Sequence, residues 1–142
     1  GTTFGGGPLA SAVAIEFLRQ LDHLLPHITK LGNYFTAQLK QLQSKHPAVK
    51  DVRGMGLMLA VDLDSSETAK AVVSELLAKG ILINRTHETV LRFLPPYIIE
   101  KRHVDEVVRA LDLALAKSGT KSRTTKHTKV NDGKRKQSER SH

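Results

Sequence analysis

The sequence predicts an α+β fold: a small sheet of three or four strands, covered on one face by helices and preceded by a long helix. Three observations support this class. Apolar residues recur at helical spacing in some segments, they alternate in others, and glycines and prolines separate the two kinds of segment. The order is helix, helix, strand, strand, helix, strand, strand, helix, which suits one sheet under one layer of helices.

The first part of the chain is a glycine-rich loop, GTTFGGGP, followed by two predicted helices. Pro8 suits the first position of a helix, and from Leu9 to Leu25 so little polar face remains that we expect this helix to be buried on most sides. Pro26 has no N–H group to donate and is expected to end it. A surface helix with a narrower apolar stripe should then cover residues 28–45.

Four short strands are predicted in two pairs. The first pair is 49–53 and 57–63, and alternate apolar residues in the second of these place one of its faces in the core. The second pair is 81–83 and 90–94. The Pro95-Pro96 dipeptide that follows cannot continue a strand ladder, so the sheet should stop there.

Two further helices are expected around these strands. The first begins after an N-cap at Asp64 or Ser65, with Glu67 placed to complete a capping box, and it ends at Gly80. The last helix ends at Lys117. The apolar residues of these helices and of the central strand should share one core, which contains Leu57, Leu59, Val61, Val72, Leu76, Val107 and Leu111.

The positive charge is concentrated at the C-terminus. The chain has 22 Lys and Arg against 14 Asp and Glu, a net charge of +8, and residues 117–142 contain 9 of the basic and 2 of the acidic residues. From residue 118 onward Val130 is the one bulky aliphatic side chain, too little to offset the entropy of ordering. The predicted organisation is therefore a loop with a linking helix (1–25), a small α+β domain (26–117) and a disordered basic tail (118–142).

Several classes of site are excluded by composition. The chain has no cysteine, which excludes disulfides, thiolate metal sites and a cysteine nucleophile. The histidines show no metal-binding spacing, so no metal site is predicted. No apolar run reaches the roughly 18 residues of a membrane span, and no secretory signal is present, so we expect a soluble, cytoplasmic protein without membrane contact. Because Gly1 lies inside a motif, we expect a piece of a longer protein.

Two places along the chain could bind a ligand. Thr2 and Thr3 precede three glycines and a helix N-terminus, and hydroxyls, free N–H groups and the helix dipole together favour a phosphate. The alternative there is a helix cap with a flexible lead. Arg92 stands alone among apolar strand residues, so we expect a buried guanidinium that needs a carboxylate partner. The alternative is an arginine that reaches solvent from a strand edge.

Three separated stretches resemble a known family. They are GTTFGGGPLASAVA (residues 1–14), VRGMGLMLAVDL (residues 52–63) and NRTHETVLRFLPPYII (residues 84–99). In order and spacing they resemble the C-terminal third of class III pyridoxal-phosphate aminotransferases, and within that class the acetylornithine aminotransferases. The resemblance covers residues 1 to about 116. It implies the small C-terminal domain of a fold-type I aminotransferase.

The resemblance also implies roles for particular residues. Thr3 would donate a hydrogen bond to the phosphate of pyridoxal phosphate in the neighbouring subunit of a homodimer, and Thr2 would lie near the substrate. Arg92 would face a substrate carboxylate or a gating glutamate. Two positions depart from the family pattern. Gly7 replaces the usual Asn and removes an amide from the loop, whereas Ser11 replaces a frequent Cys and is interpreted as a packing difference.

The resemblance implies that the catalytic residues themselves lie elsewhere. A transaminase of this kind needs a lysine that binds the cofactor aldehyde and an acidic residue at the pyridine nitrogen, and in the family both precede the loop. No lysine here has such a context, so we expect the chain alone to be inactive. Arg53 is expected to order a bend by bonding nearby carbonyls, and His87 and Glu88 to lie in a solvated turn.

The implied reaction is amino transfer from N-acetylornithine to 2-oxoglutarate in arginine biosynthesis. Ornithine, succinylornithine or another ω-amine is an alternative amino donor. A module that binds nucleic acid or another polyanion through its basic tail is a hypothesis of a different class. Against it, the folded part is nearly neutral and the tail has no aromatic residues to stack on bases. A purely structural interaction domain is the third hypothesis.

Overall fold

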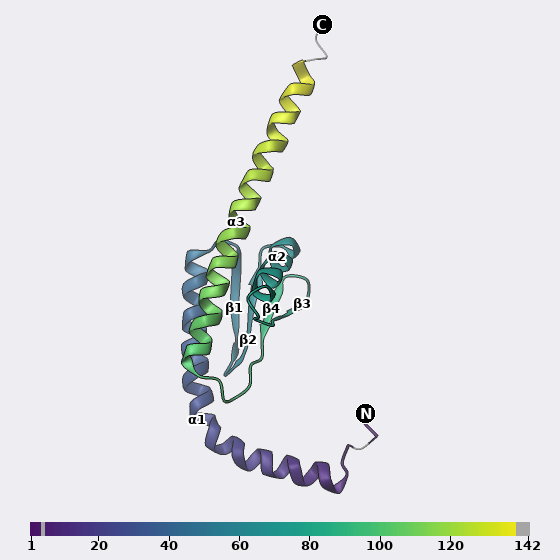
Figure 1. Cartoon of the computed structure of the whole chain (residues 1–142), viewed down its shortest axis with the longest axis vertical. Helices are drawn as coiled ribbons and strands as arrows, with labels where there is room; N and C mark the ends of the chain where they lie inside the picture. The colour runs from purple at the N-terminus through teal and green to yellow at the C-terminus, as the bar shows by residue number, and fades with distance from the viewer. Residues whose placement is uncertain (4, 139–142) are drawn as a thin grey trace.

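The computed structural model describes residues 1–3 and 5–138, with side chains through residue 119 (Figure 1). Its three helices and four strands confirm the predicted α+β class. In chain order they are α1 (Pro8–Lys45), β1 (Val49–Met55), β2 (Met58–Leu63), α2 (Ser66–Leu77), β3 (Asn84–Thr86), β4 (Val90–Phe93) and α3 (Lys101–Ser138).

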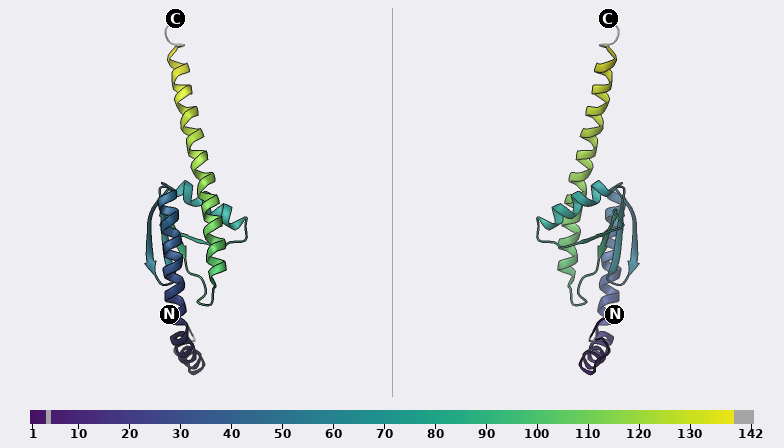
Figure 2. Two further views of the ribbon diagram at one scale, coloured as in Figure 1. Left: turned by 90° about the vertical axis from the view of Figure 1, so that its left-hand side faces the viewer. Right: turned by 90° about the vertical axis from the view of Figure 1, so that its right-hand side faces the viewer.

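The four strands form one antiparallel sheet in the order β1-β2-β4-β3. Side chains alternate along β2, where Leu59, Val61 and Leu63 are buried and Met58 is exposed. α1 and α3 lie side by side on the buried side of the sheet (Figure 2), and α2 packs against α3. The helices therefore cover one face of the sheet, as predicted, and we call the other face the open face.

One hydrophobic core joins the sheet to the three helices. Phe35 of α1 meets Phe93 of β4 in an edge-to-face contact, with ring centroids 5.2 Å apart. Six of the seven predicted core residues are buried, and Val107 is partly buried against them. The six are Leu57, Leu59, Val61, Val72, Leu76 and Leu111.

α1 is a single helix of 38 residues, so the predicted break at Pro26 is wrong. A proline inside a helix removes one hydrogen bond and bends the axis, but the bonds on either side can carry the helix through. Figure 1 shows that α1 changes direction along its length. Its buried side chains begin at Ile28, after the proline. Pro26 therefore separates a packed part from a projecting part of one helix.

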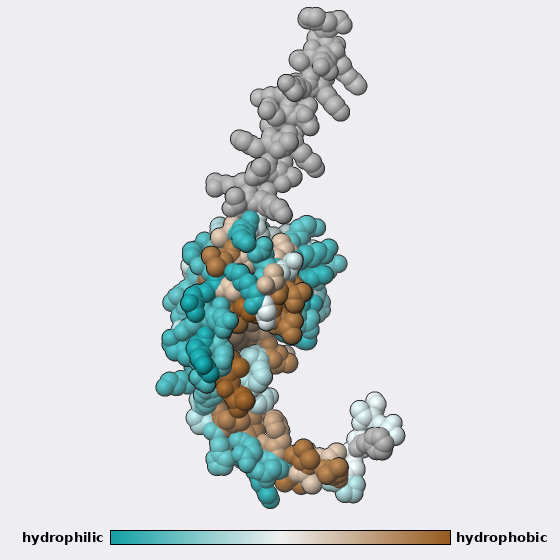
Figure 3. Space-filling model, viewed as in Figure 1, coloured by the Kyte–Doolittle hydropathy of each residue, from teal (hydrophilic) through white to brown (hydrophobic). Residues whose placement is uncertain are grey.

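The projecting part of α1, which we call the N-terminal arm (residues 8–25), is largely exposed, which contradicts the expectation of burial on most sides. Leu9 is 80% exposed and Phe17 49%. Figure 3 shows apolar side chains along the arm. The arm meets the domain from its middle onward, where the Phe17 ring lies 6.2 Å from that of Tyr97 and Leu21 and Leu24 pack partly buried against the core. An apolar pattern indicates that a surface needs a partner, but it does not place that partner in the same chain.

The third strand starts three residues later than predicted. β3 covers Asn84–Thr86, and residues 81–83 are not in a strand. The register pairs Asn84 with Arg92, and its continuation would set Ile81 opposite Pro95, which has no N–H to share. Ile81 instead packs partly buried against the core. Packing and the proline thus override the strand pattern here.

The predicted limits of α2 are confirmed. Of the two candidate caps, the structure selects Ser65, whose hydroxyl accepts the N–H of Thr68 at 3.1 Å. Glu67 is then one position too early to complete the capping box. Gly80, at φ +77, closes the C-terminal end in the left-handed conformation that favours glycine.

α3 continues to Ser138, whereas the sequence pattern predicted a helix end at Lys117 and disorder from residue 118. No proline follows Lys117, and basic and polar residues can extend a helix that is already nucleated. Among residues with described side chains, burial along α3 ends at Leu115. Residues 139–142 lie outside the described residues. Within the described part of the chain, no helix has the length and apolar character needed to cross a membrane.

Candidate functional site

The loop before α1 forms a tight turn that presents hydroxyl groups at a helix N-terminus. The N–H of Gly5 donates to the carbonyl of Thr2 at 3.3 Å. A Cβ at Gly5 would lie 2.5 Å from the Thr2 hydroxyl oxygen, so the Thr2 side chain would have to rotate to make room for it. Thr2 and Thr3 are both exposed. The turn therefore leaves both threonines accessible to a ligand.

The N-terminus of α1 has no side-chain cap. Gly7 is the N-cap residue and has no side-chain oxygen to accept the N–H groups of the first turn, while Pro8 occupies the first turn. A helix N-terminus with uncapped N–H groups and neighbouring hydroxyls has the donor set that phosphate oxygens need. Because glycine replaces the asparagine that is usual at position 7, no side-chain group caps the first N–H groups of α1, and they remain available to a ligand.

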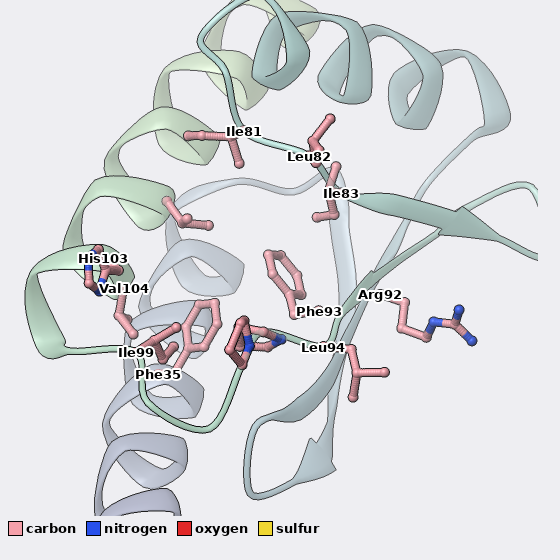
Figure 4. A pocket seen from close by; sticks show the side chains of 13 residues that line it. Phe35, Ile81, Leu82, Ile83, Arg92, Phe93, Leu94, Ile99, His103 and Val104 are labelled. Carbon is pink, nitrogen blue, oxygen red and sulfur yellow. The ribbon is translucent and has the colours of Figure 1, made fainter.

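Arg92 lies in β4 on the open face of the sheet, so the expected burial is wrong. Its neighbours in the chain, Leu91 and Phe93, are buried under the helices, and Arg92 points the other way and is exposed. Figure 4 shows its side chain directed away from Phe93, although Arg92 is one of the residues that line a mostly apolar cavity of about 410 Å³ at this strand. The burial of Arg92 was predicted from its apolar neighbours in the chain, but successive residues of a strand face opposite sides of the sheet.

The structure separates the loop from Arg92. Thr2 and Thr3 lie at the far end of the N-terminal arm, and Figure 1 shows that end of the chain well away from β4. The guanidinium of Arg92 takes part in no hydrogen bond or ion pair within the described part of the chain. The two candidate binding elements therefore do not form one site within a single copy of this chain.

The other candidate residues have structural surroundings. Arg53 bonds the carboxylate of Asp51 at 2.7 Å and lies 3.8 Å from Asp62, rather than bonding carbonyls as expected. His87 and Glu88 lie in the turn between β3 and β4, as predicted, and both have positive φ angles. Within the described residues, neither His87 nor Glu88 has a hydrogen bond or ion pair with Arg92.

Three residues beside Arg92 were not predicted from the sequence. Leu82, Asn84 and Leu94 line the same cavity of about 430 Å³ as Arg92 and Ile83. Asn84 is directly opposite Arg92 in the β3–β4 register. The alternation of residues 90–94 could have indicated that Leu94 faces the same side of the strand as Arg92. That Asn84 lies opposite Arg92 could be identified only from the strand register.

The perturbed pKa values occur away from this cavity, where α1 meets α3. The Tyr34 hydroxyl and the Lys101 ammonium, which donate to Asp105, lower the pKa of that carboxyl. Lys45 and His46 likewise donate to Asp112 and lower its pKa. These contacts join the α1 and α3 segments of the chain, so we assign them to stability.

Comparison with known proteins identifies the family. Residues 1–115 match the aminotransferase class-III family. An acetylornithine aminotransferase of Methanocaldococcus jannaschii is 43% identical over 114 residues, which are 79% of this chain and 28% of that protein. An ornithine aminotransferase of Staphylococcus aureus is 46% identical over 107 residues, covering 74% of this chain and 26% of that protein.

The solved structures agree with the sequence relatives. The acetylornithine aminotransferase of Elizabethkingia anophelis superposes with a TM-score of 0.72 at 33% identity, over 82% of this chain and 32% of that one. The chain thus spans little more than a quarter of the curated relatives it matches, 28% of the first. With a matching fold and a match over residues 1–115, this chain belongs to the class III aminotransferases.

Proposed function

We propose that this chain is the C-terminal small domain and phosphate loop of a pyridoxal-phosphate-dependent transaminase. The proposed reaction moves the amino group of N-acetylornithine to 2-oxoglutarate, in arginine biosynthesis in the cytoplasm. The lysine and the acidic residue that such an enzyme needs belong to a part of the protein outside this chain. The chain alone is therefore inactive, and activity requires the longer protein as a homodimer.

The loop fits the phosphate of the cofactor. When bound, pyridoxal phosphate supplies the electron sink for amino transfer. The Thr3 hydroxyl donates to a phosphate oxygen, and the uncapped N-terminus of α1 adds backbone donors and a favourable dipole. The distance of this loop from Arg92 within one copy supports a dimer in which Thr3 serves the partner's cofactor. Thr2, next to it, would then lie beside the substrate.

A single observation carries the substrate proposal, namely the free guanidinium of Arg92. It lies on the open face of the sheet and has no carboxylate partner within the described residues. A guanidinium pairs with a carboxylate through two parallel hydrogen bonds, which orients the bound acid as well as holding it. N-acetylornithine and 2-oxoglutarate both have carboxylates that Arg92 can bind. The same holds for ornithine and succinylornithine, which remain alternative amino donors.

The experiment uses the chain joined to the missing part of a transaminase, so that cofactor binding and turnover can be measured together. Thr3→Ala should weaken cofactor retention by about 1–3 kcal/mol, the range for a hydrogen bond to a charged group. Arg92→Ala should raise the Michaelis constant for the dicarboxylate substrate and leave cofactor retention nearly unchanged. Cofactor retention is followed by absorbance after dialysis.

The two variants serve as controls for each other. An equal loss of cofactor in both, or no loss in Thr3→Ala, contradicts the assigned roles. Amino transfer by the unmodified 142-residue chain contradicts the proposal that the catalytic lysine lies outside it. Comparing N-acetylornithine, succinylornithine and ornithine as amino donors then identifies the substrate.

A further inference from the structure

Four residues form a row across the open face of the sheet. The register pairs Arg53 of β1 with Ala60 of β2, Ala60 with Arg92 of β4, and Arg92 with Asn84 of β3. Residues directly opposite in an antiparallel sheet point to the same face, with Cβ atoms about 5 Å apart. The short side chain of Ala60 thus separates two arginines, and an amide lies directly beside the second of them.

The two arginines of the row are in different electrostatic states. Arg53 is paired with Asp51 at 2.7 Å and lies near Asp62, so its charge is already compensated. The side chains of Arg92 and Asn84 are exposed, and neither side chain has a hydrogen bond or ion pair within the described residues. An anion approaching the open face would therefore find its unpaired donors at the Arg92–Asn84 end of the row.

The surroundings of that pair are apolar. Leu82 and Leu94 line the same cavity of about 430 Å³, and they are 85% and 63% exposed. Its size is within the range of small-molecule sites. The cavity thus offers two kinds of donor on the strands and two aliphatic side chains beside them.

We propose that Asn84 is a specificity-determining residue that binds one carboxylate together with Arg92, while Leu82 and Leu94 contact the aliphatic chain attached to it. The proposal rests on the proposed function in one respect, the binding of a substrate carboxylate by Arg92. Its ligand class is a carboxylic acid on a short methylene chain. Because Arg53 is already paired with Asp51, the carboxylate is assigned to the Arg92–Asn84 end of the row.

The chemistry of the amide explains the choice of Asn. A carboxylate has about four lone-pair positions, of which a bidentate arginine uses two. The two N–H groups of Asn84 can donate to a remaining position without adding or removing charge. An acidic residue at this place would itself pair with Arg92 and compete with the substrate.

The test measures carboxylate binding to the 142-residue chain, without cofactor and without turnover. Glutarate is titrated into the ¹⁵N-labelled chain at constant ionic strength, and the side-chain signals of Asn84 and Arg92 are followed by NMR. Both signals should move with one dissociation constant. Butyrate, which has one carboxylate on a short methylene chain, should also bind, and acetate, which has a carboxylate but no methylene chain, should bind more weakly than butyrate.

Variants at Asn84 separate its role from that of Arg92. Asn84→Ala should weaken glutarate binding about three- to tenfold, the effect of one hydrogen bond in an exposed site. Asn84→Asp should abolish it, and Asn84→Gln should restore part of it. Asn33→Ala is the matched control, because Asn33 is also exposed but lies on α1. It should bind glutarate like the unmodified chain.

The outcomes distinguish this inference from the proposed function. Loss of binding in Arg92→Ala with unchanged binding in Asn84→Ala overturns the role of Asn84 and leaves that of Arg92 intact. Absence of any glutarate-dependent shift in the unmodified chain also overturns the inference. In either case the proposed function is judged separately, by amino transfer and cofactor retention in the longer protein.

Discussion

Gly32 is a position where a single added methyl group should destabilise the fold. It lies buried in α1 and faces the turn between β1 and β2. A Cβ at this position would meet the backbone of Gly56, at 2.6 Å from its carbonyl carbon and 2.8 Å from its Cα, with the carbonyl oxygen closer still. All three neighbours are backbone atoms, which cannot rotate away as a side chain could.

The size of the effect follows from two opposing contributions. Alanine in place of glycine inside a helix should stabilise it by about 1 kcal/mol through helix propensity alone. Against this, an ordinary contact needs about 3.4 Å. The carbonyl carbon of Gly56, at 2.6 Å, must therefore move away from the new methyl group by at least about 0.8 Å. Overpacking of this kind costs roughly 1–3 kcal/mol, and the upper end applies to a rigid neighbour, so the net loss should be about 2 kcal/mol.

The assay is urea unfolding and thermal unfolding, both followed by circular dichroism, comparing Gly32→Ala with the unmodified chain. A loss of about 2 kcal/mol should lower the melting temperature by roughly 10 °C in a domain of this size. Asn33→Ala, at the next and exposed position of the same helix, should change stability by less than about 0.5 kcal/mol. A Gly32→Ala variant as stable as the unmodified chain, or more so, would refute the close approach of α1 to this turn.

Two further predictions concern the long helices. Lys45 and His46 lower the pKa of Asp112, so its ionised carboxylate stabilises the fold. This stabilisation is fully present above the unfolded pKa of about 3.9, and it is lost as the pH falls through the lower pKa of the folded state. Asp112→Asn should therefore be less stable than the unmodified chain near neutral pH, with a deficit in thermal unfolding that vanishes in acid; a deficit independent of pH would contradict this. Deletion of residues 118–142 should change the unfolding free energy by less than about 1 kcal/mol, because described burial along α3 ends at Leu115. A larger loss in urea unfolding would show that this segment docks on the domain.

The sequence predicted those features that depend on short-range patterns. The alternation in residues 57–63 identified β2 and its buried face, because the side-chain period of a strand is visible along the chain. Gly80 ended α2 as expected, because the left-handed conformation needs little beyond the glycine itself. The threonine and glycine loop and the lone Arg92 were likewise recognisable as candidate binding elements before any packing was known.

The remaining features were decided by contacts between segments far apart in the chain. Whether Pro26 ends or bends α1, and where β3 begins, depended on the packing of residues after the proline and on the register opposite Pro95. The direction of Arg92 and the pairing with Asn84 depended on that same register. Local patterns report the conformation a segment prefers, whereas the partner it packs against is a property of the folded chain. The exposed arm, the open face and the contact of Gly32 with Gly56 are all of this second kind.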